Sequence, residues 1–389
     1  MSLNQPGEIE STRKPSRVWL PEVLYMITHF CDTRTKSRCA LVFYDHVRWS
    51  TNENNAQLYN ASRHGDLHSV KRILQRSVDP LEKIYAVFTA SQRGHASVVG
   101  LLLKDARVDP SLFYNHAVRF ASSGGHAAVV EILLKDDRVD PSVLQNDAIR
   151  SASERGHTAV VELLLSDARV DPSSHDNFAI CSACENGHIA IVERLLKDAR
   201  VDPSAKRNKA IFYASMNGHI AIVERLLKDE RVEPSANDNC AIQLASKDGY
   251  AAVVELLLKD ARVDPSASDN YAIRYASKNG HIDVVELLLK DARVNPSTDY
   301  NAAIRWASER GHVSVVELLL KDARVNPAAC ENCAVCLASK SGHLAVVELL
   351  LKDARVNASV LNNYPMRMAK KNGHTAVVGL LLKHAQLPI

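Results

Sequence analysis

The sequence has no apolar run long enough to cross a lipid bilayer. The best candidates, such as residues 251–258, are short and are interrupted by Glu, whereas a membrane-spanning helix needs about 20 consecutive apolar residues. Residues 1–17 are polar and lack the apolar core of a secretory signal. We therefore expect a soluble intracellular protein, cytoplasmic or nuclear, with no membrane partner.

An excess of charge of one sign is also missing. The chain has 48 Lys and Arg against 45 Asp and Glu, a net charge of +3 over 389 residues, so nothing in the charge balance indicates a nucleic-acid partner. Eight cysteines in a chain of this length do not make a disulfide framework, and free thiols suit a reducing compartment.

The motifs of common catalytic sites are absent as well. The sequence contains no Gly-rich phosphate loop, no His-Glu-x-x-His zinc motif and no nucleophile elbow. Acidic residues occupy regular outer positions, which solubility alone explains. We therefore expect that the protein is not an enzyme and needs no cofactor.

What the sequence has in abundance is a repeat of 31 residues. Gly recurs at this interval from position 94 to position 373, and a degenerate copy carries Gly65. Eleven of the 15 glycines are therefore one position of the repeat. Length alone would suggest two or three domains, but a fixed period of this size indicates a stack of units that mainly contact their neighbours.

Positions are counted here from the Gly of each repeat. In the copy of Gly280, small and aliphatic residues stand at −8, −7 and −4 (Ala272, Ile273 and Ala276). These positions share one face of a helix, so we predict that this face is the core and lets helices approach closely. Asn270 at −10 is predicted to cap the start of this helix by accepting a backbone N–H.

The Gly-His step then predicts the end of the first helix and the start of a second. Apolar residues at +4, +5, +8 and +9 form the buried face of that second helix. Glu286 and Lys290 are spaced to form an i,i+4 ion pair on the solvent side. Residues 264–266, Asp-Pro-Ser, supply the turn that follows the second helix.

Two helices and a turn with the pattern Ala-Ser/Ala-x-x-Gly-His and Val-Val-x-Leu-Leu-Leu strongly resemble the ankyrin repeat. The resemblance covers residues 52–386, about 11 repeats, and implies an all-α, ankyrin-like solenoid. Two features depart from the family: residues 271–274 replace its Thr-Pro-Leu-His entry, and the connecting segment is shorter and lacks Gly. We therefore expect short loops instead of β-hairpins.

Residues 18–50 differ from the repeats and follow a tail, 1–17, that we predict to be disordered. This segment resembles an F-box, a family that opens with Leu-Pro and a Glu, continues with an apolar helix and runs through a Leu-Val pair to a Trp. The resemblance implies contacts with the adaptor subunit of a cullin-type ubiquitin ligase. The matching residues are Leu20, Pro21, Leu24, Ile27, Leu41, Val42 and Trp49. The alternative is a plain cap that seals the first repeat, since terminal units of solenoids are atypical.

Positions −9, −6, −5 and −2 form a second face of the first helix, opposite the Ala core, and we call it the variable stripe. Its residues differ widely between copies, and Arg, Tyr, Trp and Phe among them are typical of interaction hot spots. In ankyrin repeats this helix lines the binding surface, so we predict that the stripe contacts a protein target; the alternative is drift on a tolerant surface. The predicted contact residues are His116, Arg119, Phe120, Asp147, Arg150, Phe178, Lys209, Phe212, Tyr213, Tyr271, Arg274, Tyr275, Arg305, Trp306, Tyr364 and Arg367.

Histidines and cysteines invite a metal hypothesis. Nine repeats carry His after Gly, but helices packed about 8–10 Å apart hold successive histidines too far apart for one ion. We predict instead that each His fixes the start of its own second helix by local hydrogen bonds. Cys184 is predicted to be a small core residue. The cluster of Cys330, Cys333 and Cys336 leaves a metal or redox role open, although we predict no metal site.

These observations favour a monomeric protein that binds another protein. The first hypothesis is a substrate-recognition receptor for a cullin-type ubiquitin ligase, in which the F-box-like segment contacts the adaptor and the variable stripe holds a target. Its mechanism would be an increase in the effective concentration of the target near the ligase. The second is a stand-alone scaffold or sequestering protein whose N-terminal segment only caps the stack.

Overall fold

A computed structural model of the protein describes residues 53–385. Contacts divide the chain into two units, residues 1–148 and 149–389. The predicted tail at 1–17 and F-box-like segment at 18–50 lie outside the described residues. The described part contains helices and no strands, which confirms the predicted all-α class and the short loops.

The described part of the unit of residues 1–148, from residue 53 onward, contains six complete helices and the start of a seventh. These are α3 (Glu53–His64), α4 (Leu67–Leu74), α5 (Pro80–Arg93), α6 (Ala96–Leu102), α7 (Leu112–Ser123), α8 (Ala127–Leu134) and the first half of α9 (Val143–Glu154).

The unit of residues 149–389 contains the rest of α9 and fifteen more helices. These are α10 (Thr158–Leu165), α11 (Ser174–Glu185), α12 (Ile189–Leu195), α13 (Ala205–Met216), α14 (Ile220–Leu227), α15 (Ala236–Asp248), α16 (Ala251–Leu258), α17 (Ala267–Asn279), α18 (Ile282–Lys290), α19 (Thr298–Arg310), α20 (Val313–Leu320), α21 (Ala329–Ser341), α22 (Leu344–Leu351), α23 (Val360–Lys371) and α24 (Thr375–Ala385).

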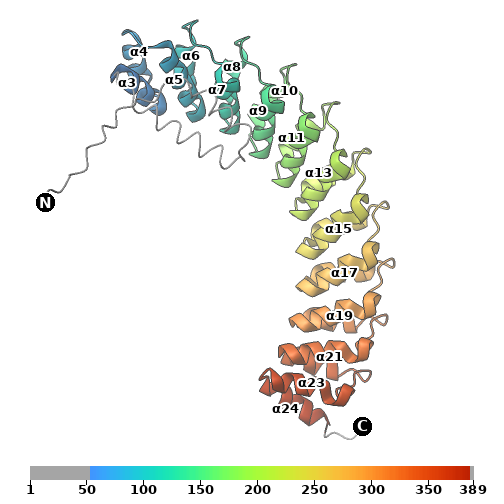
Figure 1. Ribbon diagram of the computed structural model, residues 1–389. Coiled ribbons are helices and arrows are strands. Elements are labelled where there is room, and N and C mark those ends of the chain that lie inside the picture. Colours follow the sequence, from blue (N-terminus) through green and yellow to red (C-terminus); the bar gives the residue numbers. More distant parts are fainter. Residues whose placement is uncertain (1–52, 386–389) are drawn as a thin grey trace, which may run out of the picture. The chain divides into compact units, whose positions relative to one another are not determined.

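Each repeat consists of a longer, odd-numbered helix, a turn at the repeat Gly and a shorter, even-numbered helix. Within the unit of residues 149–389, successive odd-numbered helices pack on one another as a row, and the even-numbered helices pack as a second row (Figure 1). The loops between repeats all emerge on the side of the shorter helices. This unit therefore has the predicted form of a stack of repeats, with two rows of helices.

The core lies between the two rows and between neighbouring repeats. Ala272, Ile273 and Ala276 of α17 are fully buried, as are Val284 and Leu288 of α18. Burial of one Val or Leu side chain stabilises a fold by about 1.5–3 kcal/mol, and the same positions are buried in repeat after repeat. The core predicted from the spacing of small and aliphatic residues is confirmed.

The repeat Gly ends each longer helix. Gly280 has a φ of 81°, in the left-handed region where only Gly avoids a steric cost. In this conformation the N–H of His281 donates to the carbonyl of Ala276 at 3.0 Å, which satisfies one of the last carbonyls of α17. The predicted break at the Gly-His step is therefore confirmed.

A left-handed turn begins the longer helices from α7 to α23, and the sequence pattern did not predict it. Ser268, Asp269 and Asn270 have φ values of 52°, 55° and 57°, and the same three positions are left-handed in nine repeats. Such residues cost roughly 1–2 kcal/mol each, least for Asn and Asp. The turn is closed by the N–H of Asn270, which donates to the carbonyl of Ser266 at 2.8 Å.

The side chain of the −10 Asn does not cap its own helix. The Oδ1 of Asn270, a residue that is 8% exposed, accepts the backbone N–H of Asn295 at 2.7 Å, 25 residues further along the chain. The prediction of a local cap was therefore wrong about the donor. The side chain of Asn270 instead binds the loop between α18 and α19 and so holds that loop against the start of α17.

The loops between repeats contain the predicted turn and one contact that the pattern did not predict. Ser266 donates its N–H and its hydroxyl to Oδ1 of Asp264, at 2.9 and 2.7 Å. Arg293 forms a paired contact with Asp291 and also donates from Nη1 to the carbonyl of Val263 at 2.7 Å. These bonds hold successive loops in one orientation.

The predicted ion pair on the second helix is confirmed. Lys290 Nζ lies 2.8 Å from Glu286 Oε1, and both side chains are more than half exposed. Solvent screens such a pair, so it adds little to stability.

None of the helices within residues 53–385 has the length and the apolar content that a membrane-spanning segment needs.

Candidate protein-interaction surface

The variable stripe is half-buried along most of its length. Among the sixteen predicted contact residues, Arg367 is exposed and thirteen have intermediate exposure. His116 and Arg119 are buried, each with 8% of its surface exposed. The side chains of the stripe therefore pack against one another and still present part of their surface to solvent.

The densest part of the stripe lies on α17 and α19. The rings of Tyr271 and Tyr275 stack with centroids 3.9 Å apart, and Trp306 meets Tyr275 edge-on at 5.4 Å. The guanidinium of Arg274 lies 5.6 Å and the ammonium of Lys278 lies 5.3 Å from the centroid of the Trp306 ring. We call these five residues and Arg305 the aromatic–cationic cluster. It combines flat apolar surface with positive charge.

The left-handed turns hold the cations of this cluster in place. Arg274 donates to the carbonyl of Ser268 at 3.0 Å and contacts a carboxylate oxygen of Asp299 at 3.3 Å. Arg305 donates to the carbonyl of Tyr300 at 3.0 Å and to that of Asp299 at 2.8 Å. Because most of these acceptors are neutral carbonyls, the cluster keeps a local excess of positive charge. Lys278 and Asp299 were not among the predicted contact residues, although Lys278 stands at the −2 position of the stripe.

Smaller pairs of the same kind occur elsewhere in the unit of residues 149–389. Each places a cation over an aromatic ring, and the distances to the ring centroid are typical of cation–π contacts. The pairs are Arg150 over Phe178 at 5.3 Å, Lys209 over Tyr213 at 5.7 Å and Arg367 over Tyr364 at 5.8 Å. Phe212 also meets the ring of Tyr213 at 5.2 Å.

In the unit of residues 1–148 the stripe is more deeply packed. His116 stacks on Phe120 with centroids 4.0 Å apart, and burial lowers the pKa of His116 to about 3. Its imidazole is therefore neutral near pH 7. Arg119 Nε lies 2.8 Å from Asp147 Oδ2. The structure thus places His116 and Arg119 within the packing of α7 and not on a free surface.

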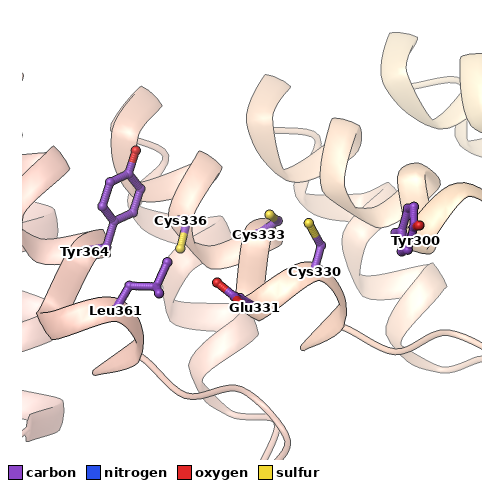
Figure 2. A pocket seen from close by; sticks show the side chains of 7 residues that line it. All are labelled: Tyr300, Cys330, Glu331, Cys333, Cys336, Leu361 and Tyr364. Atoms are coloured by element: carbon purple, nitrogen blue, oxygen red, sulfur yellow. The ribbon is translucent and has the colours of Figure 1, made fainter.

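A pocket of about 380 Å³ lies along α19, α21 and α23 (Figure 2). The residues that line it are Tyr300, Cys330, Glu331, Cys333, Cys336, Leu361 and Tyr364. Burial raises the pKa of Cys333 to about 11 and that of Cys336 to about 12. Within residues 53–385, no group of three or more His, Cys, Asp or Glu side chains is placed to hold a metal ion.

The histidines that follow the repeat Gly bind the preceding repeat. His312 donates from Nε2 to the carbonyl of Lys278 at 2.9 Å, 34 residues back, so the predicted local bond was wrong. Its ring also lies against Gly280, where an added Cβ would be 2.6 Å from the ring Nδ1. We call each Gly and the His of the next repeat the Gly–His seam. The seam therefore joins successive repeats.

Comparison with known protein families agrees with this architecture. The family described as ankyrin repeats, in units of three copies, matches residues 118–207, 148–238, 180–269, 211–299, 242–329 and 273–360. Together these matches cover residues 118–360, more than half of the chain. The chain belongs to the ankyrin-repeat family. No curated protein matches it.

As an array of ankyrin repeats, the chain is a protein–protein interaction module. The family typically provides binding scaffolds and not catalysis. The extended surfaces of such stacks are where partners bind.

Proposed function

We propose that the variable stripe binds a protein target and that the aromatic–cationic cluster on α17 and α19 is the centre of the binding site. The supporting observation is the arrangement of the cluster: stacked rings with cations over their faces, half-exposed on a row of rigid helices. Tyr, Trp and Arg dominate binding energies at protein interfaces because they bury large areas and retain polar groups. Rigid helices also lower the entropy that is lost on binding.

The charge of the cluster favours an acidic target. Arg274, Lys278 and Arg305 surround the rings, and Asp299 is the carboxylate that contacts this group. Positive charge at an interface attracts an acidic partner and discriminates against basic ones. The target is therefore proposed to present Asp or Glu next to apolar side chains.

The experiment compares full-length protein with two double variants as baits in a cell extract, followed by quantitative mass spectrometry. Tyr275→Ala with Trp306→Ala removes the ring surface, while Glu286→Ala with Lys290→Ala alters the exposed side of α18 and is the matched control. We expect at least one direct partner to be lost with the first variant and retained with the second. Its affinity should also fall as salt is added, since exposed charges are screened. If every partner survives the first variant, the proposal fails.

We propose further that the chain is a substrate-recognition receptor of a cullin-type ubiquitin ligase. Support for this role comes from the F-box-like residues at 18–50, which lie outside the described residues. In this proposal Leu20, Pro21 and Leu24 contact the adaptor subunit, while Ile27, Leu41, Val42 and Trp49 complete the contact surface. The alternative role is a stand-alone scaffold or sequestering protein.

Co-purification of the cullin adaptor with the full chain separates these two roles. The receptor role requires that the adaptor is recovered with the wild-type chain, is lost with Leu24→Asp and is kept with Tyr275→Ala and Trp306→Ala. If the adaptor is not recovered with the wild-type chain, the ligase role is excluded. That outcome leaves target binding by the stripe unaffected.

A further inference from the structure

Three thiols of α21 line one pocket, but they differ in accessibility. Cys330 is exposed, Cys333 has intermediate exposure and Cys336 is buried. Figure 2 shows the side chains of Cys330 and Cys333 directed to the same side, while Cys336 lies toward Leu361 and Tyr364. Burial raises the pKa of the Cys333 thiol, and the neighbouring Cys330 thiol raises it further, as expected for two thiols that lie close together. Two of the three thiols therefore form a pair that small molecules in solvent can reach.

The left-handed turn explains why these two residues meet. Cys330, Glu331 and Asn332 have φ values of 53°, 56° and 59°. A left-handed helical turn mirrors a right-handed one, so Cα atoms three residues apart are about 5 Å from each other. Disulfides form between Cα atoms about 4.4–6.8 Å apart. The backbone at Cys330 and Cys333 is thus already spaced for a disulfide.

A second repeat with different side chains shows the same juxtaposition. His175 and Phe178 occupy the positions of Cys330 and Cys333 in their repeat, and their ring centroids are 5.8 Å apart. The turn between them is also left-handed, with φ values of 57°, 56° and 59° at residues 175–177. The turn therefore brings positions −12 and −9 together whatever residues stand there.

We propose that Cys330 and Cys333 form a reversible dithiol–disulfide site that exchanges with small disulfides of the glutathione class. The Cys330 thiolate attacks one sulfur of glutathione disulfide, forms a mixed disulfide and releases one glutathione thiolate. The Cys333 thiolate then attacks the Cys330 sulfur, forms the internal disulfide and releases the second glutathione. The two cysteines together lose two electrons and two protons, and glutathione disulfide gains them as two thiols.

The roles of the three cysteines follow from their surroundings. Cys330 is the exposed thiol and meets the incoming disulfide first. Cys333 is the resolving thiol because the left-handed turn places it next to Cys330 in the same pocket. Cys336 is 7% exposed and lies next to Leu361 and Tyr364, so it takes no part. Burial raises the pKa of Cys333 to about 11, which makes the resolving step slow near neutral pH because only the thiolate attacks.

The experiment reads the covalent state of the full chain and does not depend on the proposed binding function. Protein is equilibrated with reduced and oxidised glutathione, free thiols are blocked, and the chain is cleaved after Lys, Arg and Glu. Cleavage after Glu331 separates Cys330 from the other two cysteines, so a disulfide to Cys330 keeps two fragments joined until it is reduced. We expect joined fragments from the wild type and from Cys336→Ser, and none from Cys333→Ser. A stable glutathione adduct on Cys330 as the sole product, or thiols that stay reduced, overturns the proposal.

Cys240 supplies an internal control. It stands at the −9 position, as Cys333 does, and the −12 position of its repeat holds Asn237 in the same left-handed conformation, with a φ of 53°. Wild-type Cys240 should form no internal disulfide, whereas Asn237→Cys should create a second pair that oxidises under the same conditions. If the Asn237→Cys chain forms no bond between residues 237 and 240, the turn does not determine the pairing and the inference fails.

Discussion

The Gly–His seam lies where the longer helices end and the shorter ones begin, whereas the variable stripe runs along the longer helices, and the two have different kinds of contact. At the seam, side chains contact backbone: His312 binds the carbonyl of Lys278, and its ring lies over Gly280. In the stripe, the aromatic side chains contact other side chains, as Tyr275 and Trp306 do. A backbone partner has one fixed position, so few residues fit it, whereas side-chain partners can be replaced together. The same fold can therefore hold a constant seam and a variable surface.

The largest effect is expected when a Cβ is added at the seam. Gly280→Ala forces Ala into a φ of 81° and places its Cβ 2.6 Å from the ring Nδ1 of His312. The left-handed Ala costs roughly 1–2 kcal/mol, and loss of the bond between His312 and Lys278 adds about 1 kcal/mol. We expect the free energy of unfolding, measured by urea titration, to fall by about 3 kcal/mol.

Gly373→Ala is the matched control for this change. Gly373 has a φ of 79°, but no described atom would lie within 4 Å of an added Cβ. Gly373→Ala should therefore lower the free energy of unfolding by about 1 kcal/mol, because only the left-handed conformation of the Ala is unfavourable. Equal losses for the two variants would show that packing of the His ring on the Gly contributes nothing.

The next largest effect is expected at the −10 Asn. Asn270→Ala removes the acceptor of the Asn295 N–H, and an unsatisfied buried donor costs about 1–3 kcal/mol. Asn270→Asp keeps an acceptor at the same place and tolerates the left-handed backbone. Its free energy of unfolding should therefore fall by less than half as much as that of Asn270→Ala. The check is the midpoint of urea unfolding for both variants. A larger loss for Asp than for Ala would contradict the inter-repeat bond.

A smaller, pH-dependent effect is expected in the loops. Hydrogen bonds from Arg262 lower the pKa of Asp260 below the usual value of 3.8. A lowered folded-state pKa means that the stabilisation is fully present well above pH 3.8 and is lost as the pH falls below it. Asp260→Asn should therefore cost about 1 kcal/mol at pH 7. The difference from wild type should shrink on acidification, as followed by thermal unfolding.

The exposed Glu286 provides the control for the loop variant. Solvent screens its pair with Lys290, so Glu286→Gln should leave the unfolding curve at pH 7 nearly unchanged. A constant difference between Asp260→Asn and wild type at every pH would contradict the role given to the Asp260 carboxylate.

The smallest effect is expected in the stripe. Lys209→Ala removes a cation 5.7 Å from the Tyr213 ring, a contact worth about 0.5 kcal/mol. The corresponding position in another repeat is already Ala302, so the backbone accepts the change. Urea unfolding should show this small loss. A loss as large as that of Gly280→Ala would mean that the stripe is part of the core and not a binding surface.

The sequence by itself determined the period, the two helices of each repeat, the buried faces and the break at Gly-His. These features follow from local spacing, because residues such as Ala272 and Ala276 share a helix face whatever lies next to it. The sequence also determined the composition of the stripe, since its Arg, Tyr and Trp residues stand at fixed positions of the repeat.

Only the tertiary structure decided what the polar residues of the repeat do. The side chains of Asn270 and His312 form hydrogen bonds with backbone groups 25 and 34 residues away in the sequence. Contacts between residues so far apart in the sequence depend on how the repeats stack and not on local spacing. The left-handed turn at residues 268–270 likewise depends on contacts that outweigh the intrinsic preference of each residue. The equivalent turn at residues 330–332 places Cys330 and Cys333 next to each other.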